Sequence, residues 1–381
     1  MSSTKWLAAI GAAALSFGVA ACGSDNNDNS SSSSSGSSTQ ASTSSGSSSG
    51  KSGKIALLLP ESKTARYESQ DRPNFEAKLK ELCPDCQIVY SNADQDASKQ
   101  QQQAEAALTQ GAKVMVLDPV DAASAASIVT RAAQQKVPVI SYDRLISDAK
   151  VAYYISYDNA KVGKLQATSL VDKLKKDGKS GSIVMINGAP TDNNAKLFKQ
   201  GAHSVIDSSD YKVGKEYDTP DWSPDKAQQE MEQAITALGK TGFVGVYAAN
   251  DGNAGGAIAA MKSNGVDPKK IPTTGQDAEL AGIQRIVAGD QYMTVYKAIK
   301  PEASAAATLA VALLRGEQPP SGLVNTKTAN GSAGDIPSVI YDPVAVTVDN
   351  IEDTIVKDGF WKASQICTAQ YAAACKTAGI Q

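Results

Sequence analysis

The sequence is poor in the side chains that carry acid–base and metal chemistry. Its 381 residues include one histidine, His203, so sites that need two histidines, such as His-rich zinc centres, are excluded. His203 falls in a predicted helix over residues 195–206, without a serine or cysteine partner in a nucleophile-elbow pattern. We find no acid–base pair that supports catalysis. The sequence therefore predicts a protein that is not an enzyme and that uses no metal and no cofactor.

Net charge is also small. The 37 Lys and Arg residues nearly balance the 40 Asp and Glu residues, which leaves a net charge of −3. Nucleic-acid binders carry a basic patch or stripe, and a balance of this kind gives no such footprint. We therefore expect no nucleic-acid partner.

No apolar run is long enough to span a bilayer, which takes roughly 20 residues. The N-terminal run, residues 6–20, follows Lys5 and precedes small residues, which is typical of a secretory signal peptide over residues 1–21. The junction Val19-Ala20-Ala21-Cys22-Gly23 resembles the lipobox of bacterial lipoproteins. We expect a lipid on Cys22 that anchors the protein to the outer face of the cytoplasmic membrane, with no other membrane contact. The alternative is a free N-terminal thiol after ordinary cleavage.

After Cys22, residues 23–53 consist mainly of Ser, Gly, Asn and Thr, and no apolar side chain among them is larger than that of Ala41. Such a segment cannot bury enough surface to offset the entropy of ordering it. We expect a disordered tether with a reach of roughly 30 Å.

Residues 54–381 are long enough for two domains, and short apolar runs alternate along them with helical patterns. This alternation predicts an α/β fold with two similar lobes, in which parallel sheets are covered by helices. The expected strands are residues 55–59, 88–90, 114–117, 137–141, 154–157, 183–187, 213–217, 243–248, 271–274 and 293–296. The clearest helices are residues 99–110, 122–135, 195–206 and 225–238.

Four further cysteines form two local pairs in the sequence, Cys83 with Cys86 and Cys367 with Cys375. Outside the reducing cytosol we expect these local pairs as structural disulfides, although the sequence leaves three connectivities open. The Cys83–Cys86 spacing is also that of a redox motif. Redox cysteines lie at a helix N-terminus, however, and Cys83 is predicted at a helix end.

Polar residues follow six predicted strands at the carboxyl ends where open parallel sheets bind ligands. They include Arg66-Tyr67, Tyr142-Asp143-Arg144, Asp192-Asn193-Asn194, Asn250-Asp251, Gln276-Asp277 and Lys297. Carboxylate, amide and guanidinium groups can bond vicinal hydroxyls, and aromatic faces such as those of Tyr67 and Trp222 can cover a sugar ring. The set favours a neutral polyol. Each Asp or Asn can instead be a helix N-cap, an alternative that Asp192 and Asp251 leave open.

The chain resembles the D-xylose-binding proteins of bacterial ABC sugar importers, within the ribose/galactose type of periplasmic binding proteins. The most specific stretches are 141–146 (SYDRLI), 154–159 (YISYDN), 192–198 (DNNAKLF), 275–278 (GQDA), 293–297 (MTVYK) and 356–360 (VKDGF). The resemblance implies two Rossmann-like lobes joined by three crossovers, a type I periplasmic binding protein that closes on its ligand by a hinge motion. We expect one lobe to comprise residues 54–158 plus about 278–325, and the other 159–277 plus about 326–381.

The resemblance also implies which side chains hold the sugar. Those that would hydrogen-bond it are Arg66, Asp143, Arg144, Asn194, Asn250, Asp277 and Lys297. Trp222 would stack on one face of the ring. On the other face family members usually have Trp, whereas this chain has Tyr67, which bears on the identity of the sugar.

The implied function is capture of D-xylose and its delivery to the transmembrane permease subunits of an ABC importer, by a monomer. The alternative within this class is a broad-specificity receptor for aldoses such as glucose and galactose that also signals to a sensor kinase or chemoreceptor. The effector domain of a sugar-responsive repressor would need an N-terminal helix-turn-helix, where this chain has an export signal. An extracellular sugar-processing enzyme is the remaining alternative.

Overall fold

The computed structural model describes residues 51–381 of the chain. The predicted signal peptide, Cys22 and nearly all of the predicted tether lie outside the described residues. Within residues 51–381 none of the helices combines the length and the apolar character that crossing a membrane would require.

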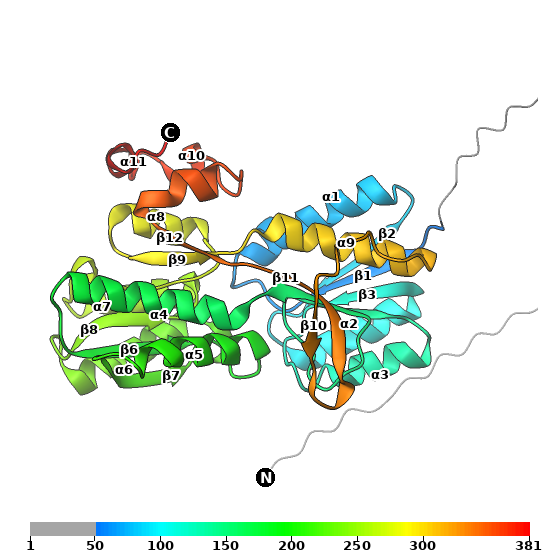
Figure 1. Cartoon of the computed structure of the whole chain (residues 1–381), viewed down its shortest axis with the longest axis horizontal. Helices are drawn as coiled ribbons and strands as arrows, with labels where there is room; N and C mark the ends of the chain where they lie inside the picture. Colours follow the sequence, from blue (N-terminus) through cyan, green and yellow to red (C-terminus); the bar gives the residue numbers. More distant parts are fainter. Residues whose placement is uncertain (1–50) are drawn as a thin grey trace, which may run out of the picture. The chain divides into compact units, whose positions relative to one another are not determined.

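The first sheet has seven strands in the order β10-β11-β5-β4-β3-β1-β2, on the right in Figure 1. Six of these strands are parallel, and only the edge strand β10 runs antiparallel, to β11. The bounds are β1 (Lys54–Leu59), β2 (Gln87–Asn92), β3 (Ala112–Leu117), β4 (Val139–Tyr142), β5 (Tyr153–Tyr157), β10 (Thr326–Ala329) and β11 (Asp335–Tyr341).

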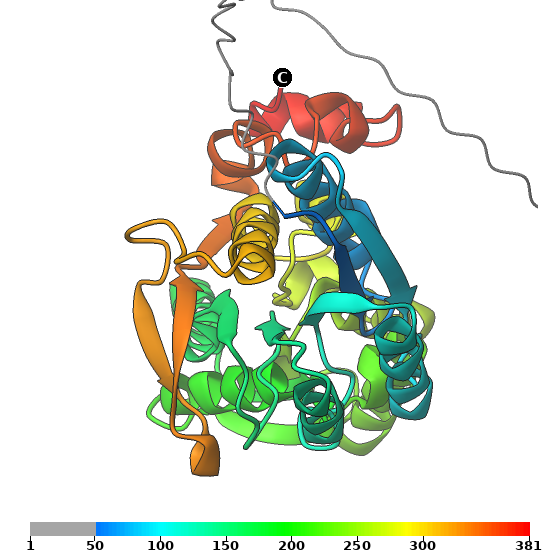
Figure 2. The same cartoon turned by 90° about the vertical axis from the view of Figure 1, so that its right-hand side faces the viewer.

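Helices cover both faces of this sheet because successive side chains of a strand point to opposite faces. Leu57 of β1 packs in the core beside α1 (Arg72–Leu82) and α9 (Ile299–Arg315). Its neighbour Leu58 packs in the core beside α2 (Ala97–Thr109) and α3 (Ala126–Gln134). Figure 2 shows α1 and α9 lying along the same face. Both side chains are buried, so β1 forms the centre of the first lobe.

The second lobe repeats this plan around a smaller parallel sheet, β7-β6-β8, with β6 (Ser182–Asn187), β7 (Lys212–Asp218) and β8 (Phe243–Ala248). Met185 faces α4 (Asn159–Lys176) and α5 (Asn193–Ile206), whereas Ile186 faces α6 (Pro224–Leu238) and α7 (Asp251–Ser263). An antiparallel pair, β9 (Met293–Tyr296) with β12 (Val344–Thr347), completes the lobe beside α8 (Leu280–Ala288).

The chain passes between the two lobes three times, after β5, between β9 and α9, and between β11 and β12. These crossings differ from the expected boundaries. Residues 326–341, expected in the second lobe, pair with the first sheet through β11 and β5. Residues 280–296, expected in the first lobe, belong to the second, because Met293 and Val295 are buried in its core.

Other predictions at the level of strands were incomplete. The strands β10, β11 and β12 were not predicted, and residues 271–274 form only an isolated bridge, between Val246 and Thr273. Two local disulfides are present, as expected. Cys83 is bonded to Cys86 with an S–S distance of 2.08 Å, and Cys367 to Cys375 with 2.04 Å.

Candidate ligand-binding site

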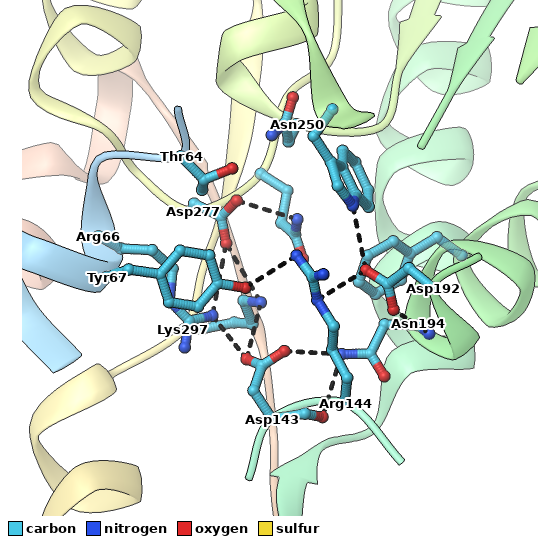
Figure 3. A pocket seen from close by; sticks show the side chains of 13 residues that line it. Thr64, Arg66, Tyr67, Asp143, Arg144, Asp192, Asn194, Asn250, Asp277 and Lys297 are labelled. Atoms are coloured by element: carbon cyan, nitrogen blue, oxygen red, sulfur yellow. Dashed lines mark hydrogen bonds and ion pairs between the residues drawn. The ribbon is translucent and has the colours of Figure 1, made fainter. Parts of the chain in front are cut away.

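The carboxyl ends of the strands in the two lobes meet at one pocket, with about 250 Å³ of space free of atoms, part of it open to solvent. All nine candidate residues line it, as Figure 3 shows for most of them. The full lining is Thr64, Arg66, Tyr67, Asp143, Arg144, Asp192, Asn194, Phe198, Trp222, Asn250, Gln276, Asp277 and Lys297. That these side chains hold a sugar stays a prediction.

The pocket lies between the lobes, and each lobe supplies one wall. In the first lobe, Thr64, Arg66 and Tyr67 follow β1, and Asp143 and Arg144 follow β4. The second lobe supplies the other eight residues, which follow β6, β7, β8 and β9 or lie in α5 and at residues 276–277. Asp143 and Asp277, on opposite walls, are only 3% and 4% exposed. The lobes are therefore closed around the pocket.

Arg66 is held rigidly by carboxylates on several sides. Its Nε and Nη2 donate to the two oxygens of Asp71 at 2.9 and 2.7 Å, and Tyr142 donates to the same carboxylate at 2.6 Å. Nη1 lies 2.7 Å from Asp143, and Nη2 lies 3.2 Å from Glu302. Burial alone would lower the pKa of Arg66, but Asp143 and Asp71 outweigh it and hold this pKa well above its ordinary value. The site keeps a fixed positive charge.

Asp143 is the centre of the polar network. Its Oδ1 accepts from Asn194 Nδ2 at 2.7 Å, and its Oδ2 lies 3.7 Å from Lys297 Nζ. Burial opposes its ionisation, but the cations Arg66 and Lys297 hold the pKa of Asp143 below the ordinary range. Among the described residues, Asp143 Oδ2 and Asp277 Oδ1 have ion-pair neighbours but no well-aligned hydrogen-bond donor. Both oxygens can therefore accept from ligand hydroxyls.

Arg144 connects the two walls. Its Nε lies 3.0 Å from Asp192 Oδ2 in the second lobe, and its Nη2 donates to the Tyr67 hydroxyl at 3.1 Å. Asp192 also accepts the indole N–H of Trp222 at 3.1 Å and caps α5 by accepting from the Asn194 N–H at 2.8 Å. Burial raises the pKa of Asp192, and Arg144 opposes that effect. The cap and the site residue are thus the same side chain.

Trp222 is held in place by a glycine and by a second aromatic ring. A Cβ built on Gly188 would come within 2.0 Å of the Trp222 ring, so only glycine allows the ring to lie there. The ring meets Phe198 edge-on, with centroids 6.3 Å apart and planes at 65°. The large apolar surface of Trp222 is therefore fixed at the pocket wall.

Three of the lining residues have left-handed backbone, which non-glycine residues seldom adopt. The φ angles are 54° at Asp143, 52° at Trp222 and 89° at Asp277. Backbone bonds hold two of them: the N–H of Asp143 donates to Ile155 O at 2.8 Å, and that of Asp277 to Val295 O at 2.9 Å. Backbone strain of this kind gathers at ligand sites, where the surrounding structure enforces it.

Four lining residues were not among the candidates: Thr64, Asp192, Phe198 and Gln276. The sequence left open whether Asp192 is a helix cap or a site residue, and in the structure it both caps α5 and lines the pocket. Asn250 likewise lines the pocket while its Oδ1 caps α7 through the Asn253 N–H at 2.8 Å. Phe198 lies one helical turn after Asn194, a spacing that would have indicated it. Asp71 and Glu302, which hold Arg66, had no comparable signal.

Comparison with known proteins identifies the family. A family model described as a periplasmic binding protein domain matches residues 55–318. The chain belongs to the periplasmic binding protein family. Members of this family are binding proteins rather than enzymes, in keeping with the prediction from the sequence. Within residues 51–381 no three His, Cys, Asp or Glu side chains are grouped as a metal ion would require.

Individual members can be compared over most of the chain. The D-xylose-binding periplasmic protein of Escherichia coli (strain K12) is 38% identical over 82% of this chain and 92% of its own length. The multiple sugar-binding periplasmic receptor of Rhizobium radiobacter is 33% identical over 82% and 92% respectively. A solved carbohydrate transporter solute binding protein from Chloroflexus aurantiacus, in complex with D-glucose, is 29% identical with a TM-score of 0.73, covering 82% of this chain and 97% of that one.

Proposed function

We propose that this protein is the extracytoplasmic substrate-binding component of an ABC sugar importer and that it captures D-xylose or a closely related aldose. The observation that carries the proposal is the closed, buried pocket, in which charged acceptors and donors from two lobes surround a small space beside Trp222. The relatives named for xylose and for several sugars support it.

The chemistry of the lining matches a neutral, hydroxyl-rich ring. Asp143 and Asp277 offer acceptor oxygens, Lys297 lies 3.1 Å from Asp277 as a donor, and Trp222 offers an apolar face. Each of the three cations in the lining, Arg66, Arg144 and Lys297, is already paired with a carboxylate. An anionic ligand would have to compete with these carboxylates for the buried positive charge, so the pocket favours an uncharged one.

Delivery requires a membrane partner and a location outside the cytoplasm. We infer that the closed form docks on the permease subunits of the importer, and that lipid on Cys22 and the segment 22–53 keep it near them. The support for this part is the lipobox-like junction and the Ser/Gly-rich composition of that segment.

Calorimetric titration with a panel of pentoses and hexoses tests the proposal. We expect D-xylose to bind with micromolar or tighter affinity and to be recovered chemically unchanged. No sugar binding tighter than about 1 mM, which corresponds to about −4 kcal/mol, would refute it. Titration with xylonate, the matching acid anion, is the control and is expected to show no binding.

A broad-specificity aldose receptor is the second candidate. It is supported by Tyr67, whose hydroxyl engages Arg144, and by the relatives described as multiple sugar-binding and as bound to D-glucose. Comparable affinities for xylose, glucose and galactose in the same titrations would favour this candidate over the xylose-specific one.

A further inference from the structure

Residues 357–381, here called the C-terminal cap, form a disulfide-closed segment beside the pocket rather than in it. The cap contains α10 (Ala363–Ile366) and α11 (Ala372–Ala378), joined by the Cys367–Cys375 bond. In Figure 1 it lies over α8. Ile366 and Ile380 are buried in one apolar cluster with Ile283 of α8, so the cap is a packed part of the second lobe.

The cap contacts the backbone that presents Asp277. The indole N–H of Trp361 donates to the carbonyl oxygen of Ala278 at 2.8 Å. Ala278 directly follows Asp277, and both residues have positive φ, 49° and 89°. The indole nitrogen can only donate a hydrogen bond, and its single N–H is used for the Ala278 carbonyl oxygen. Trp361 therefore holds the strained turn that aims the Asp277 carboxylate into the pocket.

The cap also supports the partner of Asp277. The Phe360 ring meets Tyr296 edge-on, with centroids 5.1 Å apart and planes at 70°. Tyr296 directly precedes Lys297, whose Nζ lies 3.1 Å from Asp277 Oδ1. Two consecutive cap residues thus brace both members of this ion pair.

The cap also contacts the first lobe through Phe360. Gln70 Nε2 donates to the carbonyl oxygen of Phe360 at 3.2 Å. Gln70 lies in the short helix η1 (Tyr67–Asp71), which begins beside Arg66 and ends at Asp71, the carboxylate that fixes Arg66. Close by, Ala65 N–H donates to Glu279 Oε1 across the lobes at 3.3 Å. Because Gln70 and the cap belong to different lobes, their bond depends on the lobes being closed.

We propose that the C-terminal cap is a positioning element that keeps the binding site closed. The Gln70–Phe360 bond stabilises the closed arrangement of the lobes, and the Trp361–Ala278 bond keeps Asp277 aimed at the ligand. Neither Gln70 nor Trp361 lines the pocket, so both act through other residues. The inference rests on the proposed sugar binding and adds that release of the sugar is controlled from outside the pocket.

Stopped-flow measurement of sugar release from Gln70→Ala and Trp361→Phe tests the proposal. Losing one such hydrogen bond is expected to speed dissociation by about two- to tenfold, with the association rate unchanged. Gln101→Ala is the matched control, since its amide donates within α2 to Glu105 at 3.4 Å, and it should release sugar like wild type. Dissociation unchanged in both test variants would overturn the proposal.

A second measurement separates this inference from the proposed function, because it needs no sugar. Trp361→Phe should speed hydrogen exchange of the amides of residues 277–279, and exchange at the wild-type rate would overturn the role of the cap even if no sugar bound. A Cys367→Ala/Cys375→Ala variant should speed both exchange and sugar release. A lowered melting temperature with sugar release unchanged would make the cap merely structural, against the proposal.

Discussion

At the scale of single residues, Asp143 is the point at which charge from both lobes converges. Its carboxylate contacts Arg66 from the first lobe and Asn194 from the second, and it sits on a left-handed backbone that fixes its direction. The side chain therefore both joins the walls and offers an acceptor to the ligand.

Asp143→Asn removes the negative charge and keeps the size of the side chain. We expect sugar affinity to fall by about 1.5–3 kcal/mol, roughly tenfold or more, because hydrogen bonds to a charged acceptor have that worth. Calorimetry with D-xylose measures it. Asp342→Asn, an exposed carboxylate that pairs with Lys161, is the control and should bind as wild type. Wild-type sugar affinity in Asp143→Asn would show that Asp143 does not hydrogen-bond the sugar.

Trp222→Ala removes the largest apolar surface at the pocket wall. We expect binding to weaken by about 1–3 kcal/mol through the lost burial of the ring. Trp222→Phe keeps an aromatic face but loses the N–H donor to Asp192. Its sugar affinity should therefore lie between those of wild type and Trp222→Ala. Wild-type affinity in the alanine variant would mean that the ring does not cover the ligand.

At the scale of elements, Asp251 at the start of α7 links three segments of the second lobe. Its Oδ2 accepts from the Glu279 N–H at 2.9 Å and from the Thr294 hydroxyl at 3.1 Å, and its Oδ1 from Gln291 at 2.6 Å. Burial raises the pKa of Asp251 to about 7, although Arg285 opposes that shift. α7, α8 and β9 thus meet at a carboxyl group that titrates near neutrality.

The sign of the resulting pH dependence follows from linkage. A folded pKa above the unfolded value means that the folded state binds more protons, so stability falls as pH rises from about 4 to about 7. The loss is on the order of 4 kcal/mol at most. Urea unfolding of wild type and Asp251→Asn across this range measures it, and the variant should have the flatter profile. Parallel profiles would show that Asp251 does not titrate in this interval.

Some helices and strands could be predicted from the sequence and others could not. The parallel strands and their helices were predictable because buried β1 and β6 are continuous apolar runs and helices such as α6 keep a helical period. β10 and β12 were not, since each has only four residues, with largely exposed side chains in β10 and a single buried side chain in β12. The nine candidate residues follow strand ends, which indicated a polar site there, and the role of each was implied by the family resemblance. Glu302 lies inside a helix, and only folding brings it to Arg66.

At the scale of the whole molecule, closure depends on pairs that span the lobes. Arg144 and Asp192 form one, at 3.0 Å, and both side chains are nearly fully buried. A further contact joins the Ala122 N–H to Thr191 O at 3.0 Å. A ligand shifts a conformational equilibrium only through its different affinity for the two states, so contacts made only on closure set that difference.

A double-mutant cycle of Arg144→Gln and Asp192→Asn measures the coupling across the cleft. We expect each single variant to weaken sugar binding. The double variant should lose less binding free energy than the two single losses added together, with an interaction energy of about 0.5–3 kcal/mol. Small-angle scattering should show the wild type contracting on sugar addition, and Arg144→Gln contracting only at higher sugar concentration. Strictly additive losses would show that the two side chains do not act as a pair.

The three crossings have a consequence for how the chain folds. The first sheet takes β1 to β5 from residues before 158 but does not receive β11 until residues 335–341, and the second lobe takes β12 and the cap from still later residues. Neither lobe is encoded by a continuous stretch. A chain exported in an unfolded state from its N-terminus cannot complete either half until almost all of it has emerged, so a truncation near the C-terminus would damage both halves together.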